Sequence, residues 1–108
     1  MSTRIAGFMI ASVVAATITP AVSQELGSAK QGEGLAQSVC VECHAVAPGA
    51  LRSPNGKAPT FQAIARTPGM SPMALRVWLQ SGPHREMPNL SLKADEVDNV
   101  IAYIEMLK

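Results

Sequence analysis

The sequence predicts a small all-α domain of three to four helices joined by long connections. The chain has 108 residues, which is enough for one domain. Near its C-terminus apolar residues recur at the i, i+3, i+4, i+7 spacing of a helix, at Val97, Val100, Ile101, Ile104 and Leu107. No segment alternates apolar and polar residues as a half-buried strand does.

Residues 1–23 have the pattern of a secretory signal peptide. Arg4 precedes an uncharged apolar stretch over residues 5–18, and the small residues Ala21 and Ser23 follow Pro20. We place cleavage after Ser23, so that the exported, periplasmic domain spans residues 24–108. The alternative is an uncleaved membrane anchor, for which the stretch is short against the ~20 residues of a spanning helix.

The composition excludes several classes of protein. The chain has 9 Lys+Arg and 8 Asp+Glu, and cleavage would remove only Arg4 among them, so the exported domain is electrically balanced. It contains no basic run that would indicate a nucleic-acid partner. Two cysteines exclude a disulfide-dense scaffold. With Phe61, Trp78 and Tyr103 as its only aromatic residues, so small a domain needs something more to fill its core.

Sequence signals place the helices within the domain. We expect them at residues 28–40, 60–66 and 71–80, and from residue 93 or 94 to the C-terminus. Ser28 followed by Gln31 is a capping-box signature for the first helix. Gly32 and Gly34 inside that helix each cost ~1 kcal/mol relative to Ala. We therefore expect another segment to pass close to the backbone at both glycines.

The predicted connections at residues 45–59 and 83–92 are long for a domain of this size. Seven of the eight prolines lie between Pro48 and Pro88. Loops of this length rarely hold themselves in a compact domain. We expect them to wrap around a rigid group.

The segment Cys40-Val41-Glu42-Cys43-His44 is C-x-x-C-H, the attachment signature for c-type haem. Two cysteines three apart can reach two vinyl groups on one edge of the macrocycle, and each forms a thioether. The adjacent histidine then supplies one axial nitrogen to the iron. A covalently held haem would be the missing core.

Three other readings of this segment are weaker. A structural disulfide is chemically reasonable in an oxidising compartment. A thioredoxin-like redox pair needs a βαβ context, which the sequence lacks. A zinc site that uses His84 would need a spacing from His44 far longer than that of a zinc finger.

The domain resembles class I cytochrome c of the short bacterial, His/Met type over essentially all of residues 24–108. Three blocks carry the resemblance: Gly32-x-x-x-Ala36-x-x-x-Cys40-x-x-Cys43-His44, residues 87–90 (MPNL) and residues 100–104 (VIAYI). It implies a cytochrome c-like fold wrapped around one covalently bound haem, with His44 and Met87 as iron ligands. It also implies a contact between Gly32 and Tyr103. Ala36 departs from the family, which usually has a larger residue there.

The residues themselves leave the sixth iron ligand open. A thioether is a neutral ligand that raises the reduction potential of haem iron. Met87 lies in a proline-bounded loop and can present its side chain freely, and Met70 also lies in a loop. Met73 and Met106 lie on predicted helices, where packing is the expected role. His84 is the rival to methionine and would give a bis-His iron of lower potential.

Further residues are expected around the haem. In the family a proline carbonyl satisfies the second nitrogen of the ligand histidine, and Pro59 matches that place better than Pro48. Trp78 either donates to a haem propionate or fills the cavity wall. The only charged residues between Cys43 and Glu86 are basic, namely Arg52, Lys57, Arg66, Arg76 and Arg85. They could pair with propionates, face an acidic partner or be merely solvated.

The resemblance implies an exported mono-haem electron carrier rather than an enzyme. Its partners would be redox proteins, one electron donor and one acceptor, met as a monomer in transient complexes, with no nucleic acid and no membrane span after cleavage. The alternative is a five-coordinate or bis-His c-type haem protein, acting as a ligand sensor or as a subunit of a larger oxidoreductase.

Overall fold

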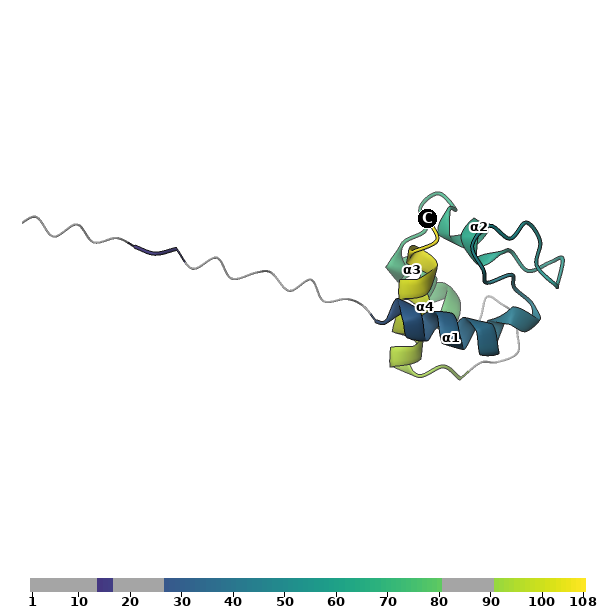
Figure 1. Ribbon diagram of the computed structural model, residues 1–108, viewed down its shortest axis with the longest axis horizontal. Coiled ribbons are helices and arrows are strands. Elements are labelled where there is room, and N and C mark those ends of the chain that lie inside the picture. The colour runs from purple at the N-terminus through teal and green to yellow at the C-terminus, as the bar shows by residue number, and fades with distance from the viewer. Residues whose placement is uncertain (1–13, 17–26, 81–90) are drawn as a thin grey trace, which may run out of the picture.

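The computed structural model describes residues 14–16, 27–80 and 91–108. Within these ranges it contains four α-helices and a short 3-10 helix, and no strand. In chain order they are α1 (Ala29–Ser38), η1 (Cys40–Glu42), α2 (Phe61–Ala65), α3 (Pro72–Gln80) and α4 (Ala94–Glu105) (Figure 1). The all-α prediction is confirmed. The first helix is shorter than predicted, because the chain tightens into η1 at Cys40.

The helix starts follow the predicted capping chemistry only in part. The Ser71 hydroxyl accepts a hydrogen bond from the Ala74 backbone N–H at 3.1 Å and begins α3. The Ser28 hydroxyl accepts from the Gln31 N–H at 3.3 Å. The other half of the predicted capping box is wrong, because the Ser28 N–H donates to Asn99 Oδ1 at 2.7 Å instead of to Gln31.

Helix α1 crosses α4 at Gly32. A Cβ atom at Gly32 would lie 1.9 Å from the Asn99 carbonyl oxygen and 2.9 Å from the Val100 nitrogen. The prediction of a close approach is therefore confirmed there. It is wrong at Gly34, where a Cβ would meet nothing within 4 Å. The closest atoms to Gly32 belong to Asn99 and Val100 and not, as the resemblance implied, to Tyr103.

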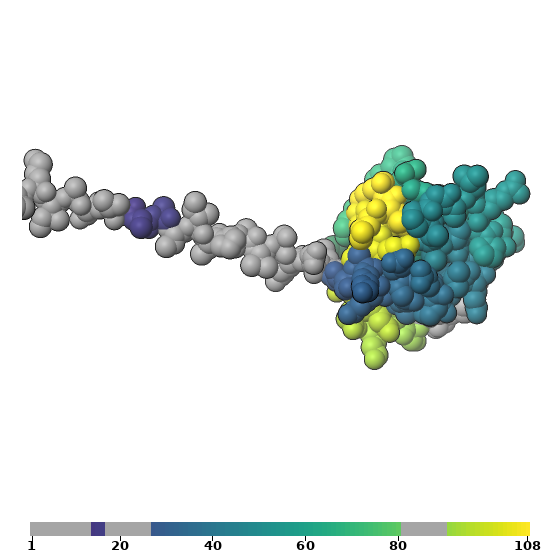
Figure 2. All heavy atoms as spheres, in the orientation of Figure 1, coloured from purple at the N-terminus to yellow at the C-terminus, as the bar shows by residue number. Residues whose placement is uncertain are grey.

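The core lies where α4 meets the other elements. All five residues of the predicted α4 stripe are buried, and they pack with other buried residues, among them Ala36, Val46, Phe61, Ala65, Leu75 and Tyr103. The C-terminal end of α4 (yellow in Figure 2) lies beside the segment that joins η1 to α2 (teal). The Tyr103 hydroxyl joins the two by donating to the Val46 carbonyl at 2.6 Å.

Several predictions fall outside the described residues. These are the signal peptide at residues 1–23 except for 14–16, the candidate ligands Met87 and His84, and Arg85. Among the described residues, no helix is both long enough and apolar enough to cross a bilayer.

Candidate haem site

The two cysteines lie on a tight turn that follows α1. The His44 N–H donates to the Cys40 carbonyl at 2.9 Å, and the Cys43 N–H donates to the same oxygen at 3.2 Å. Both cysteines are half-buried and are not joined in a disulfide. The turn therefore holds two sulfur atoms and one imidazole within a single short loop, as attachment of a macrocycle along one edge requires.

A cavity of about 470 Å³ opens beside this turn. Its volume lies in the ~300–1,000 Å³ range of cofactor sites. It is lined by residues of η1, α2, α3, α4 and the segments between them, namely Cys40, His44, Pro59, Phe61, Ala63, Ile64, Thr67, Met70, Leu75, Trp78, Leu79, Leu92, Val100 and Ile104. Almost all of these side chains are apolar, so the cavity suits a flat apolar ring joined to the chain at Cys40. The residues present fit a haem.

His44 is held in a single orientation. It is buried, and its Nδ1 lies 2.6 Å from the Pro59 carbonyl oxygen. Because a carbonyl can only accept, Nδ1 carries the proton and Nε2 keeps its lone pair. The Phe61 ring lies 5.5 Å from the imidazole, centroid to centroid, and limits its rotation. The hydrogen bond expected at Pro59 is thus present, and it is not made by Pro48.

The loop between η1 and α2 is anchored by its own hydrogen bonds. The Asn55 N–H donates to the Cys43 carbonyl at 3.1 Å, and the Ala45 N–H donates to the Ser53 hydroxyl at 3.0 Å. The Thr60 hydroxyl caps α2 by accepting from the Ala63 N–H at 3.1 Å. We did not anticipate this anchoring. The turn composition around Ser53 was the only sequence signal for it.

Burial also affects Cys40. It raises the pKa of the Cys40 thiol, because the charged form loses its hydration. A thioether sulfur carries no charge at any pH, so the apolar surroundings of Cys40 suit the attached form.

The methionines of the described residues differ in whether they line the cavity or face the solvent. Met70 is half-buried and lines the cavity. Met73 and Met106 are 69% and 71% exposed. The packing role expected for Met73 is therefore wrong, since its position on α3 faces away from the core, and its exposure excludes Met106 from the core as well. Trp78 lines the cavity with part of its surface while 48% of it remains exposed.

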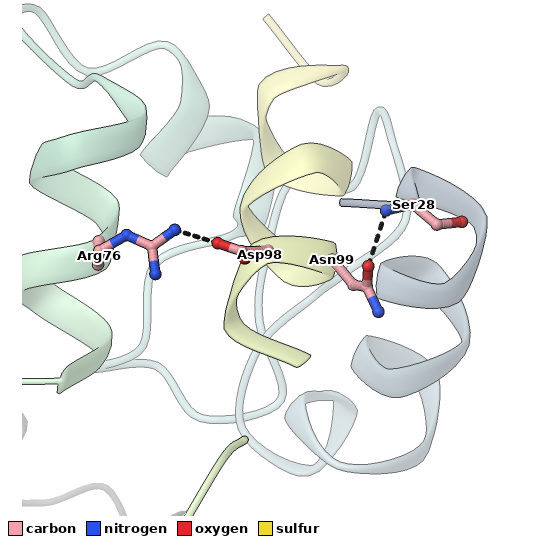
Figure 3. A network of polar contacts seen from close by, with 4 residues as sticks. All are labelled: Ser28, Arg76, Asp98 and Asn99. Atoms are coloured by element: carbon pink, nitrogen blue, oxygen red, sulfur yellow. Dashed lines mark hydrogen bonds and ion pairs between the residues drawn. The ribbon is translucent and has the colours of Figure 1, made fainter. Parts of the chain in front are cut away.

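The basic residues do not form one uniform surface. Arg76 on α3 makes an ion pair with Asp98 on α4 (Figure 3). It is therefore committed to helix packing rather than to a propionate. Arg52, Lys57 and Arg66 are exposed.

Comparison with known proteins identifies the family. Residues 27–104 match the family described as cytochrome C oxidase, cbb3-type, subunit III. No curated protein and no solved structure matches the chain. The family match covers α1, η1, α2, α3, α4 up to Ile104, the Cys40–His44 turn and every residue that lines the cavity. The chain therefore belongs to this cytochrome c family, whose chemistry is haem-based electron transfer, and its Cys40 and Cys43, spaced as C-x-x-C-H, support one covalently bound haem c.

Proposed function

We propose that the protein is an exported electron carrier whose single haem iron is held between His44 and Met87. One observation carries the proposal: His44 is buried, oriented by the Pro59 carbonyl, and lines an apolar cavity together with Cys40. When bound, the haem supplies an iron that cycles between the ferrous and ferric states. Held by both His44 and Met87, the iron would offer no position to a substrate, which favours electron transfer over catalysis.

The chain tunes this site through the surroundings of His44. A hydrogen bond from Nδ1–H to the Pro59 carbonyl makes Nε2 a stronger donor to a metal. Leu75, Leu79 and Ile104 give the cavity an apolar lining. Trp78 completes the wall while reaching the surface, so it belongs to the haem environment in our proposal.

Met87 is proposed as the second ligand because of the resemblance carried by residues 87–90. Its neutral thioether favours the ferrous state and raises the potential. Among the methionines of the described ranges, Met70 is the one that lines the cavity, so Met70 is the natural competitor.

The test compares Met87→Ala with Met70→Ala in the haem-loaded protein. Met87→Ala should abolish the methionine–ferric charge-transfer band, lower the reduction potential and allow carbon monoxide to bind the ferrous iron. Met70→Ala should keep the band. The reverse result would assign the ligand to Met70, and a wild-type protein without the band would reject methionine ligation in favour of a five-coordinate or His84-ligated iron.

A second candidate function is that of an electron-transfer subunit within a larger oxidoreductase. The description of the matched family, subunit III of a cbb3-type oxidase, favours it. Fractionation of the native host distinguishes the two candidates. A freely diffusing carrier should elute alone from the periplasmic fraction, whereas a subunit should co-purify with oxidase activity at constant stoichiometry.

A further inference from the structure

We infer that Asp98 and Asn99, two adjacent residues of α4 that we call the α4 joint, set the spacing between the two walls of the haem cavity. Asn99 holds α1 and Asp98 holds α3 (Figure 3). This inference rests on the proposed His44/Met87 ligation, because it concerns how firmly the second ligand is kept on the iron.

Asn99 fixes the wall that carries the cysteines. Its Oδ1 accepts from the Ser28 N–H at 2.7 Å, and its Nδ2 donates to Gln31 Oε1 at 3.0 Å. The Asn99 carbonyl oxygen also lies where a Cβ of Gly32 would be. These contacts lock the start of α1 onto α4. The other end of α1 leads directly into the turn that begins at Cys40.

Asp98 fixes the wall formed by Leu75, Trp78 and Leu79 of α3, which we call the α3 wall. Its carboxylate pairs with Arg76, and the two side chains are only 32% and 29% exposed. Arg76 lies on α3 between two residues that line the cavity, Leu75 and Trp78, although it does not line the cavity itself. Helix α3 ends at Gln80 and runs into the segment that contains Met87. Its position on α4 therefore determines where that segment starts.

The two walls differ in what else holds them. The wall that carries the cysteines, which follows α1, is additionally attached to the haem through the Cys40 and Cys43 thioethers. The α3 wall has no covalent attachment among the described residues, so its placement depends on packing and on the Arg76–Asp98 ion pair. Loss of Asp98 should therefore free the α3 wall and expose the iron on the Met87 side. Loss of Asn99 should cost stability without exposing the iron.

The experiment uses the haem-loaded ferric protein, with imidazole as an exogenous ligand. Asp98→Ala and Asn99→Ala are matched variants, since each truncates one residue of the α4 joint to Ala. We expect Asp98→Ala to raise the affinity for imidazole by about three- to fivefold, the range open to a partly exposed ion pair, and to weaken the methionine–ferric band, because a ligand gains access in proportion to the open population. Asn99→Ala should lower Tm while its imidazole affinity stays within about twofold of wild type.

Two further variants keep the inference falsifiable if Asp98→Ala folds poorly. Arg76→Met should reproduce the gain in imidazole affinity from the α3 side. The charge-reversed pair Arg76→Asp/Asp98→Arg should restore the wild-type affinity. An equal gain in Asn99→Ala, or no gain in either Asp98→Ala or Arg76→Met, would overturn the inference.

The same titration keeps this inference separate from the proposed function. If wild type bound imidazole as tightly as Met87→Ala, the Met87 ligation would be wrong, and the inference would fall with it. If wild type bound weakly and Met87→Ala tightly, the ligation would stand. The comparison of Asp98→Ala with Asn99→Ala would then decide the inference alone.

Discussion

At the scale of single residues, two backbone carbonyls of the segment between η1 and α2 orient the buried rings. The Pro59 carbonyl accepts from His44, and the Val46 carbonyl accepts from Tyr103 at 2.6 Å. The Tyr103 ring lies 6.4 Å from the Phe61 ring, centroid to centroid, and Phe61 in turn lies against His44. A row of rings therefore connects α4 to the proposed iron ligand.

Removal of the Tyr103 hydroxyl should destabilise the fold. Val46 is buried, so Tyr103→Phe leaves its carbonyl without a partner. We expect a loss of about 1–3 kcal/mol in the free energy of unfolding. Denaturant unfolding of the haem-loaded protein measures it, and an unchanged midpoint would contradict the importance of this hydrogen bond.

Tyr103 should also titrate at unusually high pH. Burial, and secondarily the negative charge of Glu33, raise the pKa of the Tyr103 hydroxyl above its ordinary value. It is the only tyrosine of the chain, so the tyrosinate absorption reports on it directly. We expect that absorption to appear at a higher pH in the folded protein than in the unfolded chain.

The consequence for stability follows from proton binding. The folded protein holds this proton more tightly than the unfolded chain does. The contribution of Tyr103 is therefore complete below pH ~10 and is lost as pH rises through the higher folded pKa. Unfolding free energies measured across that range should fall less steeply in Tyr103→Phe than in wild type. Equal slopes would mean that Tyr103 titrates normally.

At the scale of the elements, the crossing of α1 and α4 requires one glycine and tolerates another. Gly32 lies against the α4 backbone, whereas Gly34 faces open space on the same helix. Gly32→Ala should force the helices apart and cost about 1–3 kcal/mol or more. Gly34→Ala should stabilise the protein by about 0.5–1 kcal/mol, through the better helix propensity of Ala. Thermal unfolding compares the pair, and similar effects of the two substitutions would refute the crossing geometry.

The number of helices and most of their bounds could be predicted from local signals. The apolar stripe of α4 and the Ser71–Pro72 start of α3 are recognised from residues that are near neighbours in the sequence. The partner of the Ser28 N–H could not be predicted, because Asn99 lies 71 residues from Ser28. Gly32 lies against another backbone and Gly34 does not, because of the path that α4 takes. The sequence of α1 gives no information on that path.

The candidate site was predictable to a similar extent. Spacing alone pointed to Cys40, Cys43 and His44, and the resemblance pointed to Pro59. The ion pair of Arg76 was not foreseen, since its partner Asp98 looked like an ordinary acidic residue in the first turns of a helix. The role of Asp98 depends on its contact with α3, which cannot be recognised from the sequence around Asp98.

At the scale of the whole molecule, charge is unevenly distributed along the chain. No acidic residue lies between Glu42 and Glu86, while Arg52 and Arg66 are exposed within that stretch. Acidic residues gather instead at the start of α4. We propose that the exposed arginines of this stretch face an acidic redox partner.

An anionic oxidant tests this surface without knowledge of the partner. We expect Arg52→Gln/Arg66→Gln to slow electron transfer to ferricyanide at low ionic strength, with the difference vanishing near ~1 M salt, where the Debye length is ~3 Å. Stopped-flow mixing measures the rates. Lys30→Gln is the control, because Lys30 is exposed at the end of α1 remote from Cys40. The control removes one charge against two, so an effect half as large in the control would show that only net charge matters.

The central claim is that an exported chain, cut after Ser23, is built around one haem joined to Cys40 and Cys43. The intact mass of the denatured protein, matured in a host with haem-ligation machinery, tests it most directly. We predict the mass of residues 24–108 plus one haem. A colourless protein with the mass of the processed polypeptide alone would contradict the account.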